Sequence, residues 1–121
     1  MPPRKADPDG AANVDLVRAA LDRGEEPPQA ALRSAARHFL MELEREAPGR
    51  SVEVRVVPVA AVQVVAGPRH TRGTPPNVVE TDPLTWIRLA TGRQGWAEAV
   101  RSGAVRASGA RADLSDYLPL G

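Results

Sequence analysis

The residues whose types and spacing suit chemistry are gathered in one proline-rich segment, 67–77 (GPRHTRGTPPN), which contains Arg69, His70 and Arg72. Arginine presents a planar fork of hydrogen-bond donors that fits a carboxylate or a phosphate, and backbone amides near glycine help to hold an anion. Three prolines restrict the segment and reduce the entropy that it loses when it orders around a ligand. We therefore predict that this loop forms the polar mouth of an apolar pocket, with Arg72 as its anion contact.

Two other interpretations of the loop remain open. In the first, it is a structural loop whose arginines pair with Glu80, Asp82 or Glu53. In the second, the protein is an enzyme in which His70 and an arginine polarise a substrate carbonyl while Glu80 moves a proton. The sequence contains no G-x-S-x-G elbow, no P-loop, no H-E-x-x-H and no dinucleotide glycine fingerprint. We therefore expect no catalytic residue, no metal site and no cofactor.

Apolar side chains supply the other candidate ligand contacts. They lie on the apolar stripe of a long helix, in a valine-rich run, and at two of the four aromatic positions of the chain. Each of them is also explained by simple packing in the core. Trp96 is expected to be substantially buried. The remaining histidine, His38, is predicted to form a surface pair with Glu42, one helical turn further on. The apolar candidates are Phe39, Leu43, Val62, Val64, Trp86 and Trp96.

The elements that must position these residues follow from hydrophobic periodicity. Asn13 is predicted to cap a short helix that Gly24 ends, and a second helix is predicted over 29–47 from its stripe of period 3.6. Residues 52–57 alternate between apolar and charged, so they and the run 60–66 are predicted to pair as neighbouring strands, with the long helix across one face. Further elements are expected in this order: a strand at 77–81, helices at 83–91 and 96–102, a strand at 104–108, and a final helix at 112–118.

Composition limits the class of protein. With 121 residues, one domain is expected over 13–121, and residues 1–12 are predicted to be a disordered, dispensable tail because they have little to bury. The chain has no cysteine, so disulfides and thiolate metal sites are excluded. A formal net charge of +1 gives no general attraction for nucleic acid. No segment is apolar enough for stable membrane insertion, and we expect a cytoplasmic protein.

The stretch TGRQGWAEAVRSGAVRASG in the carboxy-terminal part of the chain carries a glycine and alanine spacing formed by Gly92, Ala99, Gly103 and Gly109. This spacing resembles that of the bacterial branch of the sterol-carrier-protein family. The family pattern is a glycine that closes one helix, an alanine inside the next, and a glycine on each side of the last strand. The upstream runs PGRSVEVRVVPVAAVQ and GPRHTRGTPPNVVETDP also look like the bacterial branch, and the resemblance covers roughly residues 30–120. In this sequence the pattern falls, without a gap, on Gly92, Ala99, Gly103 and Gly109.

The resemblance implies an α+β fold, with a small, mostly antiparallel sheet of four to five strands packed against helices. It also implies non-catalytic binding of a lipid-like or other hydrophobic or amphipathic small molecule in an apolar pocket. The alternative is an interaction or regulatory domain of the same fold with a filled core, for which a protein partner is the expected ligand. Extractable ligand distinguishes the two.

Overall fold

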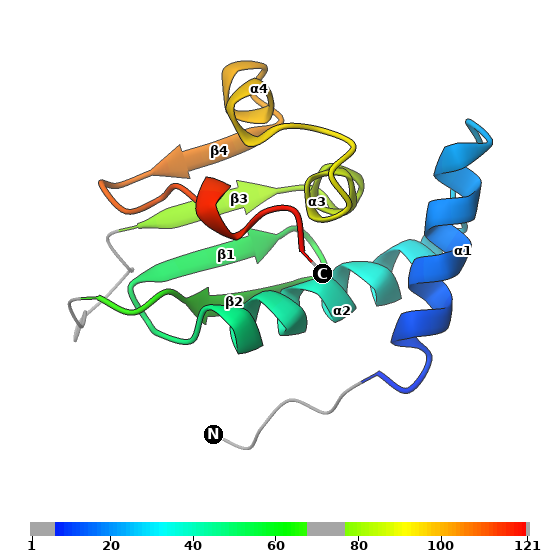
Figure 1. Cartoon of the computed structure of the whole chain (residues 1–121), viewed down its shortest axis with the longest axis horizontal. Helices are drawn as coiled ribbons and strands as arrows, with labels where there is room; N and C mark the ends of the chain where they lie inside the picture. The colour runs from blue at the N-terminus through cyan, green and yellow to red at the C-terminus, as the bar shows by residue number, and fades with distance from the viewer. Residues whose placement is uncertain (1–6, 68–76, 121) are drawn as a thin grey trace.

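The computed structural model describes residues 7–67 and 77–120, and it has an α+β architecture (Figure 1). The element types and their order agree with the sequence-based prediction up to the last strand. In chain order the elements are α1 (Gly10–Asp22), α2 (Gln29–Glu46), β1 (Val52–Val56), β2 (Ala60–Val64), β3 (Val78–Thr81), α3 (Pro83–Ala90), α4 (Trp96–Arg101), β4 (Val105–Ser108) and a 3-10 turn, η1 (Ser115–Tyr117).

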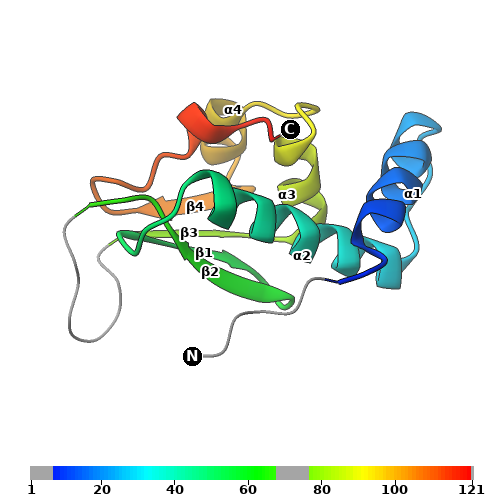
Figure 2. The same ribbon diagram turned by 60° about the horizontal axis from the view of Figure 1, so that its bottom comes forward.

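The four strands form one open, mixed sheet in the order β2-β1-β3-β4. The predicted hairpin is confirmed, because β1 and β2 are antiparallel neighbours with Val54 opposite Val62. The β3–β4 pair is also antiparallel, whereas β1 and β3 are parallel. Figure 2 shows α2, α3 and α4 on the same side of this sheet, and none of the described helices covers its other face.

The alternation in β1 explains the two faces. Val52, Val54 and Val56 are buried towards the helices, and the residues between them lie on the outer face. The predicted stripe of α2 packs against this apolar side, with Leu40 and Leu43 among the most completely buried side chains. α1 packs on α2, at one end of the molecule (Figure 1).

The predicted start of the first helix is wrong. α1 begins at Gly10, and the predicted cap Asn13 lies inside the helix. The physical reason is a tertiary contact, because the carboxylate of Asp7 accepts a 2.6 Å hydrogen bond from the buried hydroxyl of Ser34 on α2. This contact holds the start of α1 against α2, so residues 7–12 are part of the packed structure. The predicted helix end at Gly24 is confirmed by its φ of 70°.

The predicted final helix at 112–118 is also wrong, since only η1 forms there. Ala112 and Leu114 are buried while the residues between and beside them are exposed, which is an extended alternation. In addition, the carboxylate of Asp113 accepts a 2.8 Å hydrogen bond from the backbone N–H of Ser115. Such local side-chain bonds to the backbone compete with helix formation. The segment therefore crosses the helical side of the sheet mainly as extended chain.

Candidate functional site

Five of the six apolar candidates meet in one cluster between the sheet and the helices. α2 and α3 supply three of them and β2 supplies two. Each is at most 3% exposed, so a molecule the size of water reaches almost none of their surface. In this conformation they form packed core, and a ligand that contacts them must first displace protein atoms. These residues are Phe39, Leu43, Val62, Val64 and Trp86.

Trp86 also connects two of the helices directly. Its indole Nε1 donates a 3.1 Å hydrogen bond to the backbone carbonyl of Ala36 on α2. The helix α3 that carries Trp86 is capped at its start, where the Asp82 carboxylate accepts a 3.1 Å bond from the N–H of Thr85. Trp86 thus fixes the distance between α2 and α3 on the apolar side of the sheet. A buried indole N–H needs such a partner.

Trp96 lies apart from this pair of helices, as the first residue of α4. It packs against the core as expected, but it is half-buried rather than fully enclosed. The buried residue of α4 is Ala99, whose small side chain lets the short helix approach the sheet. Trp96 therefore retains surface that a ligand can contact in this conformation, unlike the five buried candidates.

The polar candidates Arg69, His70 and Arg72 lie outside the described residues. The structure does describe both ends of their loop. At one end, the carbonyl of Val65 accepts hydrogen bonds from the N–H and the hydroxyl of Ser51, at 3.1 and 2.7 Å. At the other end, the buried side chain of Asn77 donates a 2.8 Å bond to the carbonyl of Ser51. Ser51 therefore ties the two ends of the loop together.

Arg111 is a further polar residue at the base of this loop, and sequence patterns gave no signal for it. Its backbone N–H donates a 2.9 Å hydrogen bond to Oδ1 of Asn77. Its side chain lies against Gly67, where an added Cβ would be only 2.9 Å from Nη1 of the guanidinium. The carboxy-terminal segment that begins here thus meets the loop at its base, and it brings an exposed arginine to that point.

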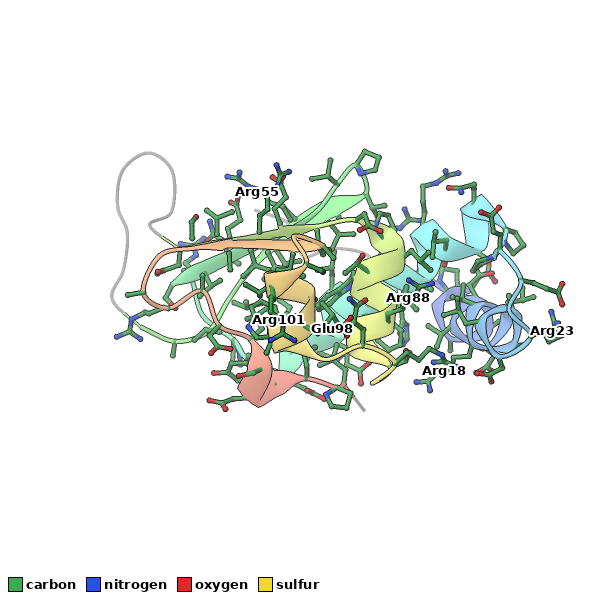
Figure 3. The ribbon with its side chains drawn as sticks, turned by 90° about the horizontal axis from the view of Figure 1, so that it is seen from above. Arg18, Arg23, Arg55, Arg88, Glu98 and Arg101 are labelled. Carbon is green, nitrogen blue, oxygen red and sulfur yellow. The ribbon has the colours of Figure 1, made fainter. Side chains whose placement is uncertain are left out.

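The three carboxylates proposed as partners for the loop arginines have other contacts. Glu53 pairs with Arg55, Glu80 pairs with Arg106, and Asp82 caps α3. Figure 3 shows Arg55 on the side of the sheet away from the helices, and Glu80 shares that outer face because its strand neighbours Val79 and Thr81 are buried. This position separates Glu80 from the apolar cluster, so it gives no support to a catalytic role for Glu80 at a pocket on the helical side.

His38 contacts α1 rather than forming the predicted pair with Glu42. Its ring packs edge-on against Phe39, with ring centroids 5.7 Å apart. It also lies so close to Gly10 that a Cβ there would be 2.8 Å from Nδ1. Asp7 is near this group, and its pKa is lowered, first by the hydrogen bond from Ser34 and then by the backbone N–H of Asp9, with smaller contributions from Arg37 and His38. His38 thus belongs to the contact between α1 and α2.

Two hollows lie on the outer side of the sheet. One of about 180 Å³ is lined by β3 and β4, and another of about 300 Å³ lies further along the same two strands. Glu80 and Arg106 border both. Within residues 7–67 and 77–120, no group of three or more histidines and carboxylates is arranged to hold a metal ion. None of the described helices is both long and apolar enough to cross a bilayer.

The fold and the arrangement of the apolar cluster define a small α+β protein with helices on one face of a mixed sheet. The chain belongs to the bacterial SCP ortholog family, the sterol-carrier-protein-like proteins of bacteria, whose family model matches residues 28–120. No curated protein matches the chain. The resemblance inferred from the glycine and alanine spacing is thereby confirmed, and α1 lies before the matched region.

Proposed function

We propose that the protein binds a hydrophobic or amphipathic small molecule, without chemical conversion, between the sheet and the helices. The observation that carries this proposal is membership of a sterol-carrier-like family, for which hydrophobic ligand binding is the expected activity. The apolar cluster that α2, α3 and β2 share is the surface such a ligand would contact. Burial of apolar ligand surface contributes about 25 cal/mol per Å².

The ligand needs a route, because the side chains that would line its site are closely packed. The segment 109–120 covers the cluster with few connections to the rest of the fold. In the described part of the chain, its backbone N–H groups make two hydrogen bonds to other elements: Arg111 to the side chain of Asn77 and Leu120 to the carbonyl of Ala90. Its side chains Ala112, Leu114 and Leu120 are buried in the core. Movement of this segment would uncover the cluster, and we place the entrance beneath it.

A polar mouth at this entrance would orient an amphipathic ligand. Arg111 lies where the segment meets the base of the 67–77 loop. We propose that Arg111 and the loop residues Arg69, His70 and Arg72 contact an anionic head group, with Arg72 as the principal contact. A guanidinium bound to a carboxylate is a strong, charge-assisted interaction. The half-buried Trp96 is the proposed apolar contact on the side of α4.

Two probes with the same hydrocarbon tail test this proposal: palmitate, which is anionic, and hexadecanol, which is neutral. The delipidated protein is titrated with each, and native mass spectrometry counts the bound molecules. Both should bind with one molecule per chain, because the tail supplies most of the affinity. Arg72→Ala and Arg111→Ala should each weaken palmitate about ten-fold and leave hexadecanol unchanged.

The matched control is Arg101→Ala, since Arg101 lies on α4 with its side chain directed away from the sheet (Figure 3). This variant should bind both probes as the wild type does. Equal loss of palmitate in all three variants would mean that general charge, rather than a mouth, attracts the acid. Failure of the wild type to bind either probe would refute the proposed function.

A second candidate is an interaction or regulatory domain with a filled core. The close packing of the apolar cluster favours it, since its five side chains are nearly inaccessible. Native mass spectrometry of the protein as purified separates the two candidates. Co-purifying lipid supports the carrier, whereas a ligand-free mass together with no uptake of palmitate or hexadecanol supports the filled core.

A further inference from the structure

Among the described residues, β4 is the end strand of the sheet and its outer edge is open. In the described part of the chain, β3 is the only strand that pairs with β4, and no other backbone hydrogen bond reaches residues 105–108. Figure 3 looks down on this edge, with α4 beside it on the helical side and no ribbon crossing it. Arg106, Ala107 and Ser108 are all exposed. An unpaired edge of this kind is a template for a further strand.

The hydrogen-bond pattern shows which groups face the open edge. The N–H of Glu53 and of Val57 on the β1 side donate to the carbonyls of Asn77 and Thr81, so alternate residues of β3 face β1. Val78 and Glu80 therefore face β4, where they are opposite Ser108 and Arg106. Since the direction alternates along a strand, the N–H and C=O groups of Val105 and Ala107 must point outward. Two donors and two acceptors are thus available for an added strand.

The side chains at this edge indicate what the added strand contains. Arg106 lies on the outer face and pairs with Glu80, yet 78% of its side chain remains exposed. The two hollows extend on either side of it, one towards Ser108 and the other towards Ala104. An added strand would place one residue opposite Arg106, and its neighbours two positions away would lie beside the hollows. A carboxylate fits the first position and short apolar side chains fit the other two.

Charge distinguishes an acidic partner from a second copy of this chain. Residues 99–112, which contain β4, include Arg101, Arg106 and Arg111 and no acidic residue. Two copies could pair antiparallel through β4, with the outward groups of Val105 in each copy bonded to those of Ala107 in the other. Arg106 would then lie directly opposite Arg106 of the other copy. Like charges in that position are destabilising. An acidic segment gains an ion pair in the same place.

We propose that the open edge of β4 is a docking site for an extended, acidic peptide segment of a partner protein, which adds to the sheet as a fifth strand with a carboxylate against Arg106. The backbone groups of Val105 and Ala107 supply the hydrogen bonds. This mode of recognition combines main-chain affinity with side-chain selectivity at alternate positions. The site lies on the outer edge of the sheet, away from the apolar cluster on the helical side.

The test uses two acetylated and amidated peptides, Thr-Val-Thr-Glu-Thr-Val-Thr and the same sequence with a central Lys. Binding to the full chain is followed by the backbone amide signals of the isotope-labelled protein. The largest shifts should fall on Val105 and Ala107, and the Glu peptide should bind roughly two- to five-fold more tightly than the Lys peptide. Arg106→Glu should reverse this order. Arg106→Gln, which places no second acid beside Glu80, should remove the preference.

Ala107→Pro tests the edge itself. The N–H of Ala107 points away from β3, so proline removes the outward donor and spares the ladder within the sheet, as edge positions allow. Binding of the Glu peptide should be lost, whereas the control Ala107→Thr keeps the donor and should bind as the wild type does. The proposal is overturned if neither peptide binds, if Ala107→Pro binds normally, or if the preference for Glu persists in Arg106→Glu.

Discussion

Replacing Trp86 with phenylalanine tests whether this residue holds α3 against α2. The variant should lose two stabilising contributions, a hydrogen bond and the packing of the larger ring. The hydrogen bond from Nε1 to the carbonyl of Ala36 contributes about 1 kcal/mol, and that carbonyl keeps its helical partner, so no buried acceptor is left unpaired. The smaller ring leaves about 40 Å³ unfilled at a site that is 1% exposed, which costs about another 1 kcal/mol. Trp86→Phe should therefore lower the free energy of unfolding by about 2 kcal/mol.

The matched control is Trp96→Phe, because Trp96 makes no hydrogen bond through its indole among the described residues and is half-buried. Its loss should be below about 1 kcal/mol. Urea unfolding followed by far-ultraviolet circular dichroism measures both, since that signal comes mainly from the backbone. Equal losses in the two variants would refute the role assigned to Trp86. A much larger loss of unfolding free energy in Trp96→Phe would mean that Trp96 on α4, rather than Trp86, holds the helices against the sheet.

Three further changes to the chain test separate parts of the structure. Gly49→Ala should cost at least about 3 kcal/mol in urea unfolding, because its Cβ would lie 2.1 Å from the carbonyl of Val65, whereas Gly24→Ala, with open space around it, should cost about 1 kcal/mol for its positive φ. A chain that starts at residue 13 should melt several degrees lower than the full chain, since it lacks Asp7 and the first turn of α1. An unchanged melting temperature would show that residues 1–12 are dispensable. The pKa of Asp7 is lowered in the folded state, first by the bond from Ser34, so Asp7→Asn should be less stable than the wild type at neutral pH, and this difference should vanish as the pH falls through the lowered pKa; a difference that persists in acid would contradict the contact.

The sequence predicts well those elements whose hydrophobic periodicity comes from having one buried face. The alternation of valine with charged residues in β1 specifies a strand with one buried face, and the apolar stripe of α2 specifies the helix that covers it. Gly24 ends α1 as predicted because glycine adopts the left-handed conformation without a Cβ clash. These features depend on neighbours close in the sequence.

The features that the sequence does not predict depend on single contacts between distant residues. The bond between Asp7 and Ser34 joins residues 27 positions apart, and it turns a polar, proline-containing stretch into part of the fold. The bond between Trp86 and Ala36 spans 50 positions. Whether the apolar cluster is a pocket wall or a packed core is also beyond sequence patterns, because both require the same apolar side chains at the same spacing. Arg111 lies at the base of the 67–77 loop only in the folded chain, because 34 positions separate it from Asn77.

The most direct test of the proposed carrier function is methyl NMR of the protein with palmitate. The methyl groups of Leu43, Val62 and Val64 lie in the cluster that the ligand is proposed to contact, and those of Leu16 lie exposed on α1 as an internal control. We expect contacts from the palmitate chain to the cluster methyls and to Leu114, with no change at Leu16. Binding without any change in the cluster methyls would contradict it, because the ligand would then lie elsewhere on the molecule.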